Sequence, residues 1–195
     1  MRFLLPLALP ITILGCCLAA AVPATALAQD AKPAAPPVGT AIAPAQIYDK
    51  LLSGMEKEFV DAAEAMPDDK YNFAPPASAG DFKGVRTFGE QIKHVAMANE
   101  YYFHDPAAPM VDTRADIEKL KTKAEIVARL KASFALAHAY VATMTPENAF
   151  IMTKSGTRAG MAAFGIAHFM DHYGQIVEYL RMNGIVPPAS RGGGM

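Results

Sequence analysis

The chain has 195 residues, and its 18 lysine and arginine residues nearly balance its 19 aspartate and glutamate residues, giving a formal net charge of −1 at pH 7. This balance, together with the absence of any long basic run, argues against nucleic acid as a partner. The length is sufficient for one domain with its own hydrophobic core.

Residues 1–28 have the pattern of a secretory signal peptide. Arg2 precedes a long apolar stretch, and Ala26-Leu27-Ala28 forms an A-x-A cleavage site. We expect cleavage after Ala28 and a periplasmic or secreted protein without a stable membrane span. An uncleaved anchor and a lipoprotein are the alternatives. Ile13-Leu14-Gly15-Cys16 resembles a lipobox, although the apolar residues that follow Cys16 are unusual at the start of a mature lipoprotein.

The mature chain is expected to contain two parts, an Ala/Pro-rich disordered linker at residues 29–43 and a folded domain at residues 44–190. Removal of Arg2 leaves 17 basic against 19 acidic residues, a net charge of −2. Both cysteines lie within residues 1–28, so no disulfide can form after cleavage. The domain must therefore be stabilised by its core, with help from a metal.

Four segments have the apolar periodicity of amphipathic helices, and none shows a convincing strand alternation. The first spans residues 44–65, with an apolar stripe at Ile47, Leu51, Leu52, Met55, Phe59 and Ala63. The second starts at a Thr87/Glu90 capping box and ends near residue 103, and the third starts at a Thr122/Glu125 capping box. The third carries apolar residues in steps of three and four at Val127, Leu130, Phe134, Ala137, Val141 and Met144.

The fourth segment runs from about Arg158 to Asn183, where Gly184 is suited to end a helix and two prolines prevent its continuation. Four helices with one apolar stripe each predict an all-α protein, a four-helix bundle. Long connections at residues 66–86 and 104–121 permit helices that are consecutive in sequence to be separated in the bundle.

Three histidines are the strongest candidates for a functional site. His168 and His172 are four residues apart, which places them one turn apart on one helix face, and His94 lies on the second predicted helix. Their neighbours Phe164, Ala167, Gln175 and Tyr179 are not typical of a solvated face. Three converging imidazoles would form a metal site with open coordination positions and nitrogens about 3–4 Å apart. The alternative is three packed, hydrogen-bonded histidines.

Other polar residues are weaker candidates. The capping box already accounts for Glu90, which could otherwise join the metal or act as a base. Asp171 points away from His172, so we expect it to support the ligands or lie on the surface. His138 suits packing better than a role as fourth ligand or proton shuttle, and His104 is interpreted as a helix-end residue. Protons should compete with the metal below the free histidine pKa of ~6.5, which should weaken metal stabilisation by about pH 5.

Three stretches together resemble the DinB-like (DinB/YfiT-like) superfamily of metalloenzymes. They are Met66-Pro67-x-x-Lys70-Tyr71-x-Phe73, Arg86-Thr87-Phe88-Gly89-Glu90-Gln91-x-x-His94, and the segment from His168-x-x-x-His172-Tyr173-Gly174-Gln175 to Pro187-Pro188. The resemblance covers residues 44–190. It implies a four-helix bundle that binds a divalent metal, usually zinc or nickel, through His94, His168 and His172.

The resemblance also suggests a function. Relatives include thiol-dependent transferases and isomerases as well as hydrolases, so we expect a metal-dependent hydrolase or a thiol-dependent transferase acting on a small molecule. Export separates this protein from the cytosolic thiols that such transferases use. The alternative is a non-catalytic, metal-stabilised module that binds a small molecule or a partner protein. The catalytic residues and the substrate are not identified by the sequence, and a homodimer is compatible with a bundle of this kind.

Overall fold

The computed structural model describes residues 35–192. The chain divides into two units, residues 1–40 and Ala41–Met195, and the helices that the structure describes within residues 35–192 belong to the second unit. The proposed signal peptide and the first part of the linker, residues 29–34, lie outside the described residues. Within residues 35–192, no helix is both long and apolar enough to cross a membrane.

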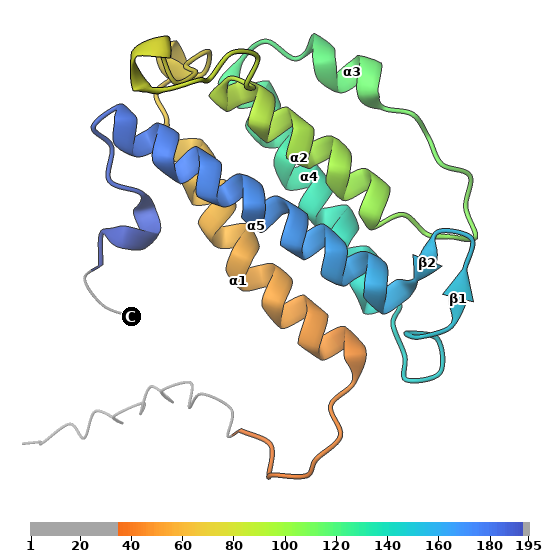
Figure 1. Cartoon of the computed structure of the whole chain (residues 1–195). Coiled ribbons are helices and arrows are strands. Elements are labelled where there is room, and N and C mark those ends of the chain that lie inside the picture. Colours follow the sequence, from red (N-terminus) through yellow and green to blue (C-terminus); the bar gives the residue numbers. More distant parts are fainter. Residues whose placement is uncertain (1–34, 193–195) are drawn as a thin grey trace, which may run out of the picture. The chain divides into compact units, whose positions relative to one another are not determined.

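Four long helices form the bundle (Figure 1): α1 at Pro44–Ala65, α2 at Phe88–Tyr102, α4 at Lys123–Ala142 and α5 at Arg158–Met182. The predicted four-helix, all-α architecture is confirmed. Helices α1 and α2 each pack against both α4 and α5, whereas α4 and α5 touch only slightly. The order around the bundle is therefore α1, α4, α2, α5, and helices that are consecutive in sequence are not all neighbours.

Local signals in the sequence determine where the long helices begin and end. Thr87 and Thr122 each accept a hydrogen bond from the backbone of a glutamate three residues later, and both reciprocal capping boxes are formed. At the end of α5, Gly184 has φ +73°, a conformation that favours glycine. The backbone N–H groups of Gly184 and Ile185 donate to the carbonyls of Arg181 and Leu180, which closes the helix with a Schellman motif.

Two small elements were not predicted. Helix α3 (Arg114–Lys119) lies in the connection between α2 and α4, and a hairpin of β1 (Met152–Thr153) and β2 (Gly156–Thr157) precedes α5. A six-residue helix and two-residue strands are too short to show periodicity. The structure also contains three short 3₁₀ turns, at Asp68–Lys70, Ala77–Ala79 and Pro188–Ser190.

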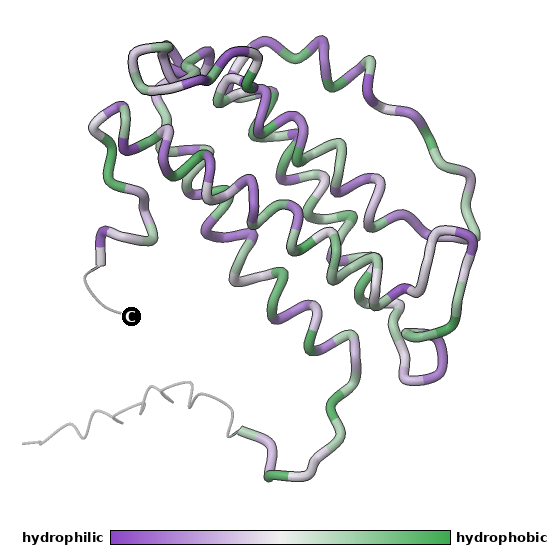
Figure 2. The backbone as a smooth tube through the Cα atoms, in the orientation of Figure 1, coloured by the Kyte–Doolittle hydropathy of each residue, from purple (hydrophilic) through white to green (hydrophobic). Residues whose placement is uncertain are grey.

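Apolar side chains from all four long helices form a single core. Figure 2 shows hydrophobic and hydrophilic positions alternating along each helix, as amphipathic helices require. The stripe predicted for α4 is confirmed, since all six of its residues are buried. The stripe predicted for α1 is wrong at Ile47 and Leu51, which are 45% and 43% exposed because the first turns of α1 lie at the edge of the core.

Candidate metal centre

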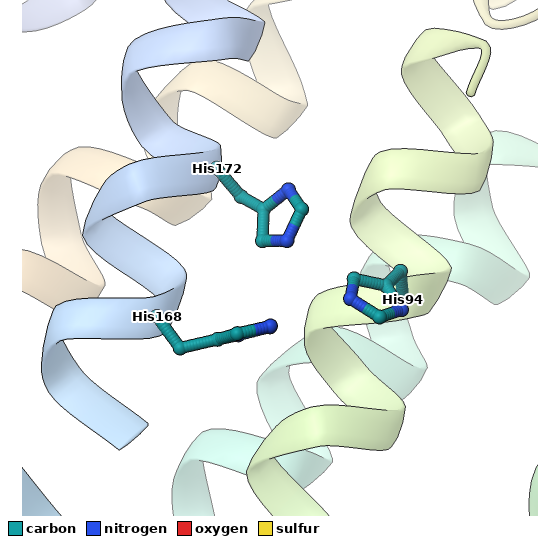
Figure 3. A group of neighbouring side chains, drawn as sticks. All are labelled: His94, His168 and His172. Carbon is teal, nitrogen blue, oxygen red and sulfur yellow. The ribbon is translucent and has the colours of Figure 1, made fainter. Parts of the chain in front are cut away.

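Three histidines from two helices lie together on one side of the bundle. His94 belongs to α2, His168 and His172 belong to α5, and Figure 3 shows their rings facing one another across the space between the helices. One ring nitrogen from each histidine lies within 4.8 Å of the other two. The ring centroids are 4.7–5.2 Å apart: 5.2 Å for His94–His168, 4.8 Å for His94–His172 and 4.7 Å for His168–His172.

These separations suit a single metal ion after small adjustments. Zinc–nitrogen bonds of about 2.0–2.1 Å place ligand nitrogens about 3–4 Å apart. In this structure the three ring nitrogens lie within 4.8 Å of one another, which is somewhat wider. The three nitrogens would therefore have to move closer together on metal binding. Two histidines on one helix face and a third on the facing helix thus have the arrangement that the sequence predicted.

A glycine allows the two helices to come close at this point. Gly165 lies on α5, three residues before His168, and is buried. A Cβ atom at this position would lie 2.8–2.9 Å from ring atoms of Phe103 and from Cβ of Tyr102, closer than real Cβ contacts. The absence of a side chain at Gly165 therefore lets α5 approach the C-terminal end of α2, next to His168.

A relay of side chains determines the tautomer of His172. The carboxylate of Asp171 can only accept hydrogen bonds, so the Nε2 amide group of Gln175 donates a hydrogen bond to Asp171 Oδ2 at 3.1 Å. The oxygen of Gln175 then accepts from Nε2 of Gln91 at 2.8 Å. This orientation leaves Oε1 of Gln91 facing Nδ1 of His172 at 2.6 Å. Nδ1 of His172 therefore carries the proton, and Nε2 keeps a lone pair that can bind a metal.

His168 has a nitrogen without a partner. Its Nδ1 is buried and forms no hydrogen bond with any described residue. A buried polar atom without a hydrogen-bond partner is energetically costly. Three neutral imidazoles, one of them with its Nε2 already oriented, form a suitable donor set for a zinc-like ion.

The surroundings keep the imidazoles neutral, which is the form that binds metals. Burial lowers the pKa of His94 to about 4, and the charges of Arg86 and His168 act in the same direction. Burial also lowers the pKa of His172 to about 4, with further effects of His168 and His94. The pKa of His168 is lowered mainly by burial, although Asp171 opposes the shift.

The remaining candidates lie outside this cluster. The side chain of Glu90 accepts from Thr87 N at 2.8 Å and completes the capping box. Nε2 of His104 is 2.8 Å from the carbonyl oxygen of Ala108, just beyond the end of α2. His138 of α4 lies between the carboxylates of Asp49 and Glu56 on α1. Arg181, near the end of α5, donates a hydrogen bond to Ser190 Oγ at 3.4 Å.

Sequence reasoning missed part of the site and misjudged its surroundings. Gln91 was not a candidate, although its position three residues before His94 places it on the same face of α2. Asp171 was expected to support the ligands or lie on the surface; it is exposed and also starts the relay. Of the four neighbours thought not to be solvated, only Tyr179 is buried, whereas Phe164, Ala167 and Gln175 are exposed. The cluster therefore lies near the surface of the bundle.

Comparison with known proteins identifies the family. The family model for the DinB superfamily matches residues 51–176, which is well over half of the chain and includes all three histidines. The match is shorter than the predicted resemblance over residues 44–190. No curated protein matches the chain. The chain therefore belongs to the DinB superfamily, and its helical bundle and three-histidine cluster are consistent with this assignment.

Proposed function

We propose that the protein is an exported metalloprotein in which His94, His168 and His172 bind one divalent metal ion, zinc or nickel. The observation that carries the proposal is the convergence of one nitrogen from each imidazole to within 4.8 Å of the others. Two further features support it, namely the lowered pKa values of the three histidines and the orientation of His172 by Gln91.

We further propose that the metal serves chemistry on a small molecule, as a metal-dependent hydrolase or a thiol-dependent transferase. A divalent ion held by neutral imidazoles retains its full charge, and its Lewis acidity lowers the pKa of a water molecule or thiol and polarises a carbonyl group. The protein contributes the ligand geometry, the tautomer of His172 and an adjacent cavity of about 470 Å³ lined in part by His94 and His168. That cavity offers a substrate access to the metal site.

Metal titration tests the ligand assignment. Isothermal titration of the purified protein with Zn²⁺ and Ni²⁺ should show one site per chain, and His168→Ala should weaken binding at least a hundred-fold. His104→Ala is the matched control, because His104 is a histidine outside the cluster. Equal metal affinity in wild type and His168→Ala would refute the site.

Cobalt substitution separates an open site from a closed, structural one. Co²⁺ bound by three imidazoles and solvent should change its visible spectrum when azide or a small thiol is added, because an external ligand can enter. A spectrum that does not respond to either would favour the non-catalytic alternative, in which metal only stabilises the bundle. Fractionation of cells that produce the full-length chain should place it outside the cytoplasm.

A further inference from the structure

A cleft with an unusual charge lies next to the histidine cluster. Two adjoining cavities of about 780 and 470 Å³ share Arg86, His94, Met97 and Glu118 in their linings. We call the two together the α2–α3 cleft. His168 also lines the smaller cavity, so two of the three histidines face this cleft.

Two arginines in the cleft lack protein partners. Arg86 and Arg114 both line it, and neither guanidinium forms a hydrogen bond or ion pair with another group in residues 35–192. The other four arginines in that range are all engaged: Arg129 with Glu100, Arg158 with Asp105, Arg181 with Ser190 and Arg191 with the carbonyl of Val186. The unengaged arginines of the described chain are thus both in the cleft beside the histidines.

The backbone of Arg86 is held in place. Its carbonyl oxygen accepts a hydrogen bond from the Tyr179 hydroxyl of α5 at 3.1 Å, and Thr87, the next residue, caps α2. The charge of Arg86 acts on all three histidines of the cluster. Arg86 therefore combines a fixed backbone with an exposed guanidinium close to the metal site.

The charge of the cleft favours anions. Its lining includes four basic and two acidic side chains, an excess of two positive charges, although the whole chain has a net charge of −1: the basic ones are Arg86, Lys93, Arg114 and Lys121, and the acidic ones are Glu90 and Glu118. Glu90 and Glu118 are the two groups that oppose an anion, and the carboxylate of Glu90 also accepts the capping-box hydrogen bond from Thr87 N. A bound divalent metal would increase the positive potential further.

An aromatic wall adjoins the charged groups. Tyr101 and Tyr102 line the smaller cavity, and Tyr101 is 51% exposed. Their ring centroids are 5.1 Å apart, and the ring of Tyr102 lies 5.4 Å from that of His168. The two tyrosine rings are tilted by 78° to each other, so the cleft offers the face of one ring and the edge of the other beside the histidines, in addition to its guanidinium groups.

We propose that the α2–α3 cleft binds a small molecule with a carboxylate or phosphate group on a flat apolar body, using Arg86 and Arg114 for the oxyanion and Tyr101 and Tyr102 for the body. A guanidinium binds both kinds of oxyanion through paired N–H groups. This inference rests on the proposed function, because it names the substrate class of the same metal site. A cavity of about 460 Å³ elsewhere, near Arg129, contains none of the three histidines.

Ligand binding to the metal-free protein tests the anion site independently of the metal. Protein stripped with a chelator is titrated with benzoate, phenyl phosphate, acetate and the neutral analogue benzamide. At least one of the two aromatic anions should bind, about ten-fold or more tightly than benzamide, and more weakly at high salt. Comparison of the affinities for benzoate and phenyl phosphate then shows whether the cleft prefers a carboxylate or a phosphate. If benzamide binds as tightly as the aromatic anions, or if neither aromatic anion binds, the proposal is overturned. If acetate binds as tightly as benzoate, the claim that the tyrosines bind an apolar part of the ligand is overturned.

Charge variants locate the binding groups. Arg86→Gln and Arg114→Gln should each weaken anion binding about ten-fold, and Glu118→Gln should strengthen it. All three side chains are exposed, so these changes spare the core. Arg181→Gln, which lies outside the cleft, is the matched control and should have no effect; an equal loss in Arg181→Gln and Arg86→Gln would refute the site.

Repeating the titration with Zn²⁺ bound links the anion site to the metal. The added positive charge should tighten binding of the aromatic anion, and unchanged affinity would contradict the claim that the cleft serves the metal site. If the protein binds no metal, the proposed function fails, whereas the anion preference of the stripped protein still tests Arg86 and Arg114.

Discussion

Nδ1 of His172 donates a hydrogen bond to the side-chain oxygen of Gln91 over 2.6 Å, which joins α5 to α2 inside the histidine cluster. Gln91 lies three residues before His94, so one face of α2 supplies both a proposed metal ligand and the group that orients His172, another proposed ligand. The orientation of Gln91 is itself set by Gln175 and Asp171. His172 therefore has its Nε2 unprotonated and oriented without the help of a metal.

Loss of this hydrogen bond should weaken metal binding without removing a ligand. Gln91→Leu is expected to lower Zn²⁺ affinity by about 10–100-fold, because the ring of His172 loses its fixed orientation and tautomer. Gln91→Glu keeps an acceptor facing Nδ1 and should bind Zn²⁺ more tightly than Gln91→Leu. Isothermal titration at neutral pH checks both variants, and equal affinities of wild type and Gln91→Leu would show that the relay plays no part in binding.

Metal binding should persist to lower pH than the free histidine pKa implies. With folded-state pKa values of about 4 for His94 and His172, few protons compete with the metal at pH 5.5. Zn²⁺ affinity should therefore fall only a few-fold between pH 7 and pH 5.5 and decline steeply near pH 4. A site made of ordinary histidines, with a pKa of ~6.5, would instead lose about a hundred-fold or more of its Zn²⁺ affinity between pH 7 and pH 5.5. The sequence alone predicted that metal stabilisation weakens by about pH 5, and the lowered pKa values in the structure move this expected loss to a lower pH.

The metal-free fold should lose stability over the same range. Between pH ~6.5 and about 4 the unfolded chain binds protons at these histidines and the folded chain does not, so the free energy of unfolding falls as pH falls. Urea unfolding of wild type and of His172→Phe, both without metal, measures this effect. The variant should show a weaker dependence on pH, and identical slopes would argue against a lowered pKa for His172.

Two glycines of α5 provide a matched pair of substitutions. Gly165→Ala should destabilise the protein by about 1–3 kcal/mol and weaken metal binding, because the new Cβ would collide with Phe103 and Tyr102 and push α5 away from α2. Gly174→Ala should stabilise the protein by up to about 1 kcal/mol, since nothing lies within 4 Å of its Cβ and alanine favours helix. Chemical unfolding and metal titration measure both, and similar effects of the two substitutions would contradict the close helix approach.

His138 connects two helices in a way that depends on pH. Its Nδ1 lies 2.6 Å from Asp49 Oδ1 and its Nε2 lies 2.8 Å from Glu56 Oε2, both on α1. Burial lowers the pKa of His138, but the hydrogen bonds to Asp49 and Glu56 outweigh burial, so the pKa is raised overall. The stabilisation is complete below the unfolded pKa of ~6.5 and is lost as pH rises through the folded pKa.

His138→Gln should therefore destabilise the protein more at pH 6 than at pH 9. The measurement is the difference in unfolding free energy between wild type and variant at the two pH values. His104→Gln is the control, because His104 bonds to a carbonyl oxygen instead of to carboxylates. A loss in His138→Gln that is the same at both pH values would show that the histidine acts by packing alone.

Much of the fold follows from the sequence because its signals are local. The capping boxes at Thr87 and Thr122 and the glycine at 184 act within a few residues, so they determine helix ends whatever surrounds them. The four-residue spacing of His168 and His172 places them on one helix face for the same reason. The apolar stripes then require the helices to pack, and the position of His94 on a second predicted helix made it the third candidate, which the family resemblance supported.

Tertiary structure decided the rest, because it depends on which helices become neighbours. The pairing of α2 with α5 across Gly165 brings His94 to His168 and His172 and places Gln91 against His172. Packing of α1 against α4 gives His138 its two carboxylates. The short helix α3 brings Arg114 to the same cleft as Arg86. These contacts join residues up to 89 positions apart, and no local period or cap in the sequence encodes them.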